Sequence, residues 1–354
     1  GETLRAAIES SSIEGENDLL FVHEVFPHTP WVRTPTGAVY PDRAGSPGQV
    51  DKVWGPNEFL ITQGLQRHLL QVGYADLIVG ELIDDLEARG VWEDALVVVT
   101  ADHGAAFESG ESPRGPATAT AEQIFNVPLF VKLPGQVTGE TDDRPASTID
   151  VLPTVVDALD VQGVDLDLDG VSLVGDPRTE PSVVDVTDGP DVALDDIDGL
   201  LAVAEANRAR LPGEGWRGVA APGPYGELVG RDLSEFDVGS TERRWSAEQA
   251  GLLFDLDLSF GAVPLILTGE MDAVDDAPDA LLIGLNGTIA GVVGFEQTSG
   301  SDAVTWSALL DESLFVDGTN TLELHQAVAG RHGRPQVGGP AVSIVGDSTG
   351  PETA

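Results

Sequence analysis

Residues 95–104 form the stretch ALVVVTADHG, a β-branched apolar run that ends in Asp102-His103-Gly104. The run is typical of a buried strand, and binding sites in open α/β sheets form outside the carboxyl ends of strands. Because the chain turns at such an end, we expect Asp102 and His103 to face one cation, with Gly104 letting the backbone turn beside it. A carboxylate and an imidazole suit Mn, Zn, Mg or Ca when further ligands come from elsewhere. The alternative is a surface Asp and His in an ordinary loop.

Helical and strand patterns alternate around this stretch. Apolar residues at three- and four-residue steps predict a helix over 63–89 that stops at Gly90. Its expected buried stripe consists of Leu65, Leu69, Val72, Val79, Leu82 and Leu86. Strands are expected at 18–31, broken at Pro27, at 95–101 and at 127–133, and a short helix is expected at 148–161, where Asp150 caps the backbone. This alternation predicts an α/β fold whose sheet is covered on both sides.

The pattern changes beyond about residue 175. We predict an α/β domain over 1–178 and an acidic linker over 179–225 that carries a helical pattern at 196–210. Short strand-like pieces then predict a small antiparallel β domain over 226–345, and 346–354 are expected to be a tail. Asn286-Gly287 between two apolar runs is a strong hairpin signal.

Charge and composition exclude several classes of protein. The chain has 354 residues and a net charge of −42, from 60 acidic and 18 basic residues. Such a surface repels nucleic acid and anionic lipid, so no nucleic-acid partner is expected. The acids are spread along the chain, which favours a general surface adaptation such as one to high salt. There is no cysteine, so disulfides and cysteine nucleophiles are excluded.

The chain contains no apolar run of about 18 residues, so it predicts no membrane span. It begins without Met, and we expect it to be the middle of a longer protein.

A second motif, HEVFPHTPW at residues 23–31, presents two histidines in a proline frame. Pro27 and Pro30 are expected to hold the backbone extended around His28. A histidine presented in this way is suited to donating a hydrogen bond to an ester oxygen or protonating a leaving group. His23 lies beside it in the sequence. The alternative is a pair of ordinary loop histidines.

The segments FVHEVFPHTPW, QRHLLQVGYADLIVGELIDDLEARGVWEDALVVVTADHG, NVPLFVKLPGQ and STIDVLPTVVDALDV, followed by DGVSL, occur in one order. In this order they resemble the C-terminal half of a sulfatase-type domain of the alkaline-phosphatase superfamily, over about residues 15–175. They are particularly similar to bacterial and archaeal sulfatase-like proteins in which such a domain follows a membrane region. The resemblance implies the C-terminal part of an alkaline-phosphatase-like α/β/α sandwich. Residues 226–345 resemble the β-rich extension found after such domains.

The resemblance also implies roles for individual residues. Asp102 and His103 match the family's metal-binding pair, with one divalent ion (Ca, Mn or Mg) as cofactor. His28 matches the catalytic histidine that contacts the ester group, and His23 is a second substrate-binding residue beside it. Arg114 is expected to meet an oxyanion, since arginine suits bidentate contacts with such groups. The alternative for Arg114 is a solvated loop charge.

One departure from the family matters for function. Its members attack the substrate with a formylglycine made in a Cys/Ser-x-Pro/Ala-x-Arg motif, or with a threonine, from the N-terminal half of the domain. The present chain contains no such motif; in ESPRG the proline follows Ser112 directly. The chain is therefore either one segment of a larger enzyme or a non-catalytic remnant.

Three hypotheses follow. The first is a metal-dependent hydrolase or transferase acting on sulfate or phosphate esters, either small anionic esters or modified glycans. We expect such a protein to be extracytoplasmic and anchored to a membrane through a segment outside this chain. The second is a degenerate relative whose β domain binds a glycan or protein partner. The third is a calcium-binding surface protein, although VDLDLDGVSL at 164–173 lacks the closing Glu of a calcium loop.

Overall fold

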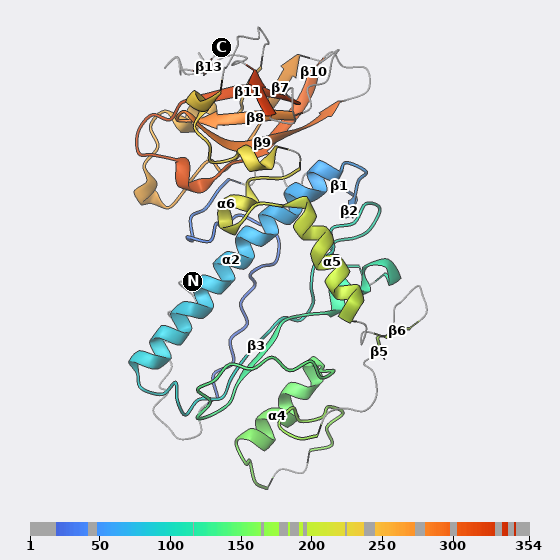
Figure 1. Ribbon diagram of the computed structural model, residues 1–354. Helices are drawn as coiled ribbons and strands as arrows, with labels where there is room; N and C mark the ends of the chain where they lie inside the picture. The colour runs from blue at the N-terminus through green and yellow to red at the C-terminus, as the bar shows by residue number, and fades with distance from the viewer. Residues whose placement is uncertain are drawn as a thin grey trace, which may run out of the picture. The chain divides into compact units, whose positions relative to one another are not determined.

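The computed structural model describes residues 19–41, 48–115, 117–163, 166–176, 183–184, 191–193, 197–223, 225–236, 245–272, 280–297, 303–329, 335–338 and 343–344. They divide into two compact units (Figure 1). The described part of unit 1 lies within Val50–Trp54 and Val79–Ala206. That of unit 2 lies within Leu19–Gln49, Gly55–Ile78 and Asn207–Ala354.

The helices of four residues or more, apart from 3-10 turns, are α2 (Glu58–Ala88), α3 (Ala121–Phe125), α4 (Val151–Ala158), α5 (Ile197–Arg210) and α6 (Gly215–Val219). The first strands are β1 (Gln49–Val50), β2 (Val53–Trp54), β3 (Val97–Thr100), β4 (Leu129–Lys132), β5 (Val183–Val184) and β6 (Val192–Ala193). The later strands are β7 (Ile266–Asp272), β8 (Ala280–Leu285), β9 (Thr288–Gln297), β10 (Ala303–Leu309), β11 (Leu322–Ala329), β12 (Pro335–Gly338) and β13 (Ser343–Ile344). Within the described residues no helix has both the length and the apolar character that a membrane crossing requires.

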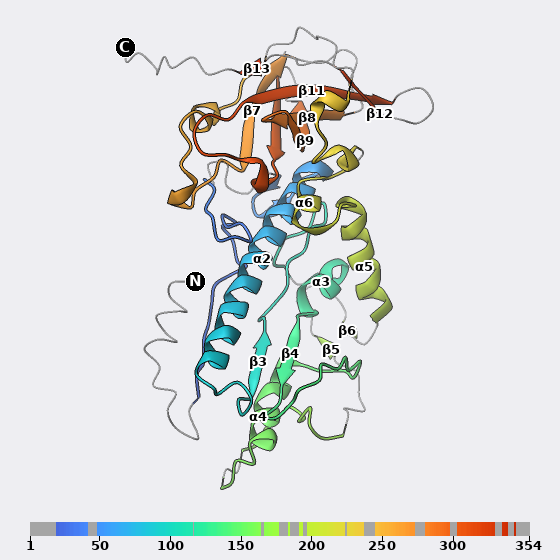
Figure 2. The ribbon, with the colours of Figure 1, turned by 60° about the vertical axis from the view of Figure 1, so that its left-hand side comes forward.

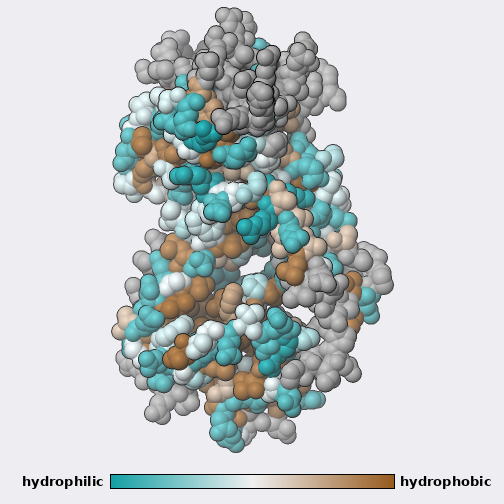
Figure 3. Space-filling model, in the orientation of Figure 1, coloured by the Kyte–Doolittle hydropathy of each residue, from teal (hydrophilic) through white to brown (hydrophobic). Residues whose placement is uncertain are grey.

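Unit 1 contains the strand that carries the Asp-His pair. Strand β3 pairs antiparallel with β4, with Val98 opposite Val131 (Figure 2). Both strands lie where the apolar runs predict them. The side chain of Phe130 on β4 is 66% exposed, and Figure 3 shows apolar side chains interspersed with hydrophilic ones on the face of this unit in view.

Unit 2 is built on a seven-stranded sheet with the order β12-β11-β8-β9-β10-β7, where β13 also pairs with β11. Strand β8 is buried at every residue, as expected for the middle of a sheet whose two faces are both covered. The β8–β9 hairpin turns at Asn286 and Gly287, both of which have positive φ (53° and 82°). This turn confirms the hairpin predicted from the Asn-Gly pair, because only such residues adopt that backbone at low cost.

The first part of α2 covers this sheet inside unit 2. A Cβ added to Gly294 on β9 would lie 1.7 Å from the Phe59 ring, so the helix approaches the strand more closely than any larger residue would permit. Gln63 exchanges hydrogen bonds with Ser307 on β10 (2.8 and 3.0 Å). After Ala88 the chain leaves the helix through Gly90, whose φ is +70°, which confirms the predicted stop.

The predicted fold class, an α/β region with a small antiparallel β region, is confirmed. Two local expectations are wrong. Leu19–Val25 form no strand, and Leu19 and Phe21 are exposed, because these residues pair with no strand among the described residues. Val72 is also exposed, since α2 turns Tyr74 and Ile78 inward. The domain boundaries at 178, 225 and 345 stay predictions, and the tail at 346–354 lies outside the described residues.

Candidate functional site

Asp102 and His103 follow β3 directly. The Oδ1 atom of Asp102 accepts a hydrogen bond from the backbone N–H of His103 (2.9 Å). The Nδ1 atom of His103 lies 2.7 Å from the carbonyl oxygen of Gly104. A carbonyl only accepts, so Nδ1 carries the proton and Nε2 keeps its lone pair, the form of histidine that binds metals.

The two free ligand atoms of this pair lie close together. Nε2 of His103 is 3.8 Å from Oδ2 of Asp102, and the side chains are 28% and 79% exposed. Atoms at this separation are both able to reach one cation, since metal–ligand distances run from about 2.0 to about 2.6 Å. The pair therefore fits a divalent ion as a partial ligand set. Among the described residues, no group of three or more acidic or histidine side chains has metal-binding geometry.

Gly104 has a reason of its own to be glycine. A Cβ at this position would lie 2.0 Å from the carbonyl oxygen of Gln123 in α3. The N–H of Gly104 donates to the carbonyl of Ile124 (2.7 Å). The backbone of α3 thus occupies the space that a side chain would need, and this contact locks the chain just beyond His103. From the sequence, Gly104 was expected to help the chain turn beside an ion. In the structure, Gly104 is needed because the backbone of α3 lies directly against it.

The loop after the pair is held by a tryptophan that sequence reasoning passed over. Trp54 is buried, its indole N–H donates to the carbonyl of Ala106 (2.8 Å), and its ring lies 5.7 Å from that of Phe107. Its backbone carbonyl accepts from Gly110 (2.8 Å). Arg114 lies further along this loop with an exposed side chain. Its role in binding an oxyanion stays a prediction.

His28 lies in a tight turn. Its backbone N–H donates to the carbonyl of Val25 (2.8 Å), so the prolines frame a turn here and not the extended segment that was predicted. Its side chain is exposed, and its Nδ1 lies 2.6 Å from the carbonyl oxygen of Thr29. As for His103, a neutral ring with its proton on Nδ1 has its lone pair on Nε2. His23 is also exposed.

The predicted site residues come from both units. Asp102, His103 and Arg114 belong to unit 1, whereas His23 and His28 belong to unit 2. The structure brings Asp102 and His103 together. That His28 contacts the same anion as this pair stays a prediction.

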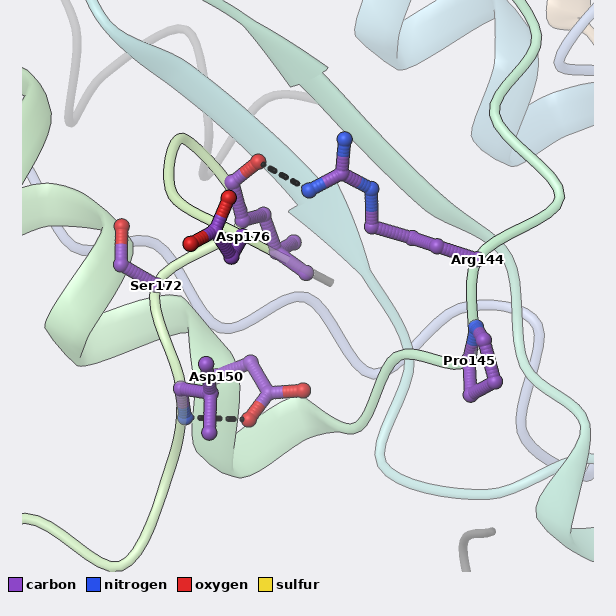
Figure 4. Close-up of a pocket in the computed structure, with 7 residues that line it drawn as sticks. Arg144, Pro145, Asp150, Ser172 and Asp176 are labelled. Carbon is purple, nitrogen blue, oxygen red and sulfur yellow. Dashed lines mark hydrogen bonds between the residues drawn. The ribbon is translucent and has the colours of Figure 1, made fainter. Parts of the chain in front are cut away.

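Asp150 serves the backbone, as the sequence predicted. One carboxylate oxygen accepts from the N–H of Ser147 (2.8 Å), and the residue is 1% exposed. The other oxygen accepts from the N–H of Val171 (2.7 Å; Figure 4). A Cβ on Gly170 would lie 2.1 Å from the carbonyl of Ile149, so DGVSL needs its glycine to pack here.

Arg144 completes this arrangement in unit 1. Its Nη1 donates to the carbonyls of Leu173 (2.9 Å) and Gly175 (3.0 Å). Its backbone N–H, and then its guanidinium, hold the pKa of the Asp142 carboxyl below its usual value. Through these contacts Arg144 connects the loop at Asp142 to the loop at Leu173–Gly175. Nothing in the local sequence indicated this role.

Sequence reasoning also missed the polar face of α2. Gln63, Arg67 and Gln71 are all buried, and they recur every four residues, which places them in one row on the helix. This spacing is the signal that was available, because polar side chains that recur at helical period on a buried side of a helix indicate hydrogen-bond partners elsewhere in the chain.

Comparisons with known proteins concern the part of the chain that contains the Asp-His pair. Residues 3–161 match the family model described as Sulfatase. The choline-sulfatase of Rhizobium meliloti is 32% identical over 134 residues, which is 35% of this chain and 25% of that protein. A low-salt glycan biosynthesis sulfotransferase of Haloferax volcanii is 35% identical over 96 residues, 24% of this chain and 23% of that protein. The steryl-sulfatase of Rattus norvegicus is 35% identical over 92 residues, 23% of this chain and 16% of that protein.

The matched segment contains strands β3 and β4 and the Asp102-His103 pair. Residues 3–161 belong to the sulfatase-like branch of the alkaline-phosphatase superfamily. The chain spans a quarter or less of the length of these relatives.

Proposed function

We propose that this chain supplies part of the active site of an enzyme that hydrolyses or transfers sulfate esters. The observation that carries the proposal is the pair at the end of β3, where His103 Nε2 and Asp102 Oδ2 lie 3.8 Å apart inside a sulfatase-matching segment. The names of the relatives, which include sulfatases and a glycan sulfotransferase, support sulfated esters or glycans as substrates. Phosphate esters are the second substrate class, since both groups are tetrahedral oxyanions.

In this proposal each residue has a separate task. Asp102 and His103 hold a divalent ion (Ca, Mn or Mg), which, when bound, polarises the oxygens of the ester group. His28, protonated on both ring nitrogens, donates a hydrogen bond or a proton from Nε2 to the departing oxygen, while its Nδ1–H stays on the Thr29 carbonyl; loss of that proton leaves the neutral Nδ1–H form. His23 and Arg114 contact the anion. The nucleophile comes from a part of the protein outside this chain. That part also anchors the protein outside the cytoplasm.

The test uses the full-length gene product with paired aryl sulfate and aryl phosphate substrates. Asp102→Ala and His103→Ala are each expected to lower kcat/KM by at least about 100-fold, because a metal ion contributes several kcal/mol to the transition state. Asp157→Ala removes another exposed acid of unit 1 and is the matched control, with turnover within about twofold of wild type. Wild-type turnover that both ligand variants retain contradicts the proposal.

A non-catalytic role is the second candidate, because the chain has no nucleophile motif and its described residues hold only a partial ligand set. Calorimetry separates the two. The enzyme predicts one tight divalent-ion site that disappears when Asp102 and His103 are both replaced by Ala. A protein that shows many weak calcium sites, unchanged in that double variant, has no such centre.

Location is tested separately. Protease added to intact cells is expected to cleave the protein without lysis if it lies outside the cytoplasm. Full protection until lysis contradicts this part of the proposal.

A further inference from the structure

One amide on α2 holds the His28 turn at two points. The Nε2 of Gln71 donates to the carbonyl of His28 (2.6 Å), and its Oε1 accepts from the N–H of Val32 (3.0 Å). The side chain is fully buried, at 0% exposed. Both polar atoms of the Gln71 amide therefore bind the backbone of the turn. The two ends of the turn, at His28 and Val32, are thus held by the same helix.

Arg67 and His68, about one helical turn before Gln71 on α2, also contact this turn. Arg67, 2% exposed, donates from Nη2 to the carbonyl of Trp31 (3.0 Å). The Trp31 indole donates in turn to the carbonyl of Pro27 (2.9 Å), and its ring lies 5.6 Å from that of His68. These contacts all lie within unit 2. The turn is thus fastened through its backbone to one face of one helix.

The functional group that this turn carries is the side chain of His28. The His28 side chain is exposed, and its Nδ1 proton is engaged by the Thr29 carbonyl at 2.6 Å. This short bond requires the backbone of residues 28 and 29 to stay in one conformation, and Gln71 holds the carbonyl of the first of them. A fixed backbone therefore fixes the tautomer and the direction of Nε2.

We infer that Gln71 is a positioning residue that holds His28, through its backbone, with Nε2 directed at the ester group. The inference rests on the proposed function, because His28 is the group that it positions. A glutamine is suited to this task since it satisfies one carbonyl and one N–H together. A carboxylate would accept from Val32 and leave the His28 carbonyl without its donor, and an aliphatic side chain would leave both buried groups unsatisfied.

Kinetics of the full-length protein supply the first test. Gln71→Leu is expected to lower kcat by about 10- to 100-fold with KM within about threefold, because displacement of a group that acts in the transition state affects the chemical step. The matched control is Gln63→Leu, which removes a buried glutamine of the same helix whose partner is Ser307 and not the turn. The control is expected to keep kcat within about twofold.

The second test needs no turnover. In protein labelled with ¹⁵N-histidine, the ring nitrogen shifts report the tautomer of each histidine, and loss of signals in His28→Gln identifies His28. Wild type and Gln63→Leu are expected to show the Nδ1–H form of His28, whereas Gln71→Leu is expected to show a mixture of both forms. An unchanged Nδ1–H form in Gln71→Leu overturns the inference.

The outcomes separate the inference from the proposed function. If wild type turns over neither substrate, the proposed function fails and the tautomer measurement alone decides the positioning role. If wild type is active and Gln71→Leu keeps both kcat and the tautomer, the positioning role fails while the function stands. Should Gln71→Leu not fold, Gln71→Glu, which keeps the size and the Val32 contact, takes its place with the same expectations.

Discussion

Protonation of His68 should destabilise the protein between pH 6.5 and 4. This histidine lies on α2 with its ring against Trp31, and its Nδ1 atom is excluded from water. Burial lowers its pKa from 6.5 to about 4, because desolvation penalises the charged ring, while a hydrogen bond to the Pro27 backbone acts in the opposite direction. At 1.36 kcal/mol per pH unit, this difference corresponds to at most about 3 kcal/mol, since the residue keeps some contact with water.

The sign follows from proton binding. Between pH 6.5 and 4, His68 binds a proton in the unfolded chain but not in the folded protein. The free energy of unfolding therefore falls as the pH falls through this window. Above pH 6.5 the contribution of neutral His68 is fully present. Below about pH 4 both states are protonated and the loss is complete.

The assay is urea unfolding at constant ionic strength, in steps from about pH 7.5 to about pH 4, for wild type and His68→Gln. Subtracting the two curves removes the carboxylates that the proteins share. The difference is expected to change by up to about 3 kcal/mol across the window. Gln63→Leu is the control, because it alters the same buried helix without removing a proton site and should shift every value by the same amount. Parallel curves for wild type and His68→Gln would refute the reasoning.

Three further predictions concern packing and charge. Gly104→Ala should lower the free energy of unfolding by about 1–3 kcal/mol, because its Cβ would lie 2.0 Å from the Gln123 carbonyl. In the same denaturation series, Gly139→Ala should change stability by less than about 0.5 kcal/mol, because the space around Gly139 is open. Arg144→Gln should cost about 1–3 kcal/mol through the lost bonds to Leu173 and Gly175. An equal cost for Arg89→Ala, which removes a partly exposed ion pair with Asp85, would contradict this. With a net charge of −42, the melting temperature should rise between about 0.1 and about 2 M NaCl, as screening shortens from about 10 Å to below about 3 Å; a flat profile would argue against charge repulsion.

The candidate site divides into a part that was visible in the sequence and a part that was not. The Asp-His pair could be predicted, because a strand pattern followed by two ligand side chains is a local signal, and the structure places those side chains together at 3.8 Å. The residues that hold His28 could not, because each contact joins α2 to a turn about 40 residues away in the chain. Gln71 and Arg67 stand in an apolar helical pattern, where nothing local says what a buried amide or guanidinium will meet.

The same division explains the errors. Leu19–Val25 look strand-like by composition, yet a strand exists only where a neighbouring strand accepts its hydrogen bonds, and the structure provides none there. Val72 fits the period of the helix, but which side of a helix is buried depends on what packs against it.

The amino-acid sequence by itself determined that α2 stops before Gly90, the strands on either side of the Asp-His pair and the hairpin at Asn286-Gly287, because periodicity and backbone preference act over a few residues. Only the tertiary structure decided that α3 packs directly against Gly104 and that side chains of α2 bind the backbone of the His28 turn. Close approach and the pairing of buried polar groups depend on which distant segments meet, and no short stretch of sequence contains that information.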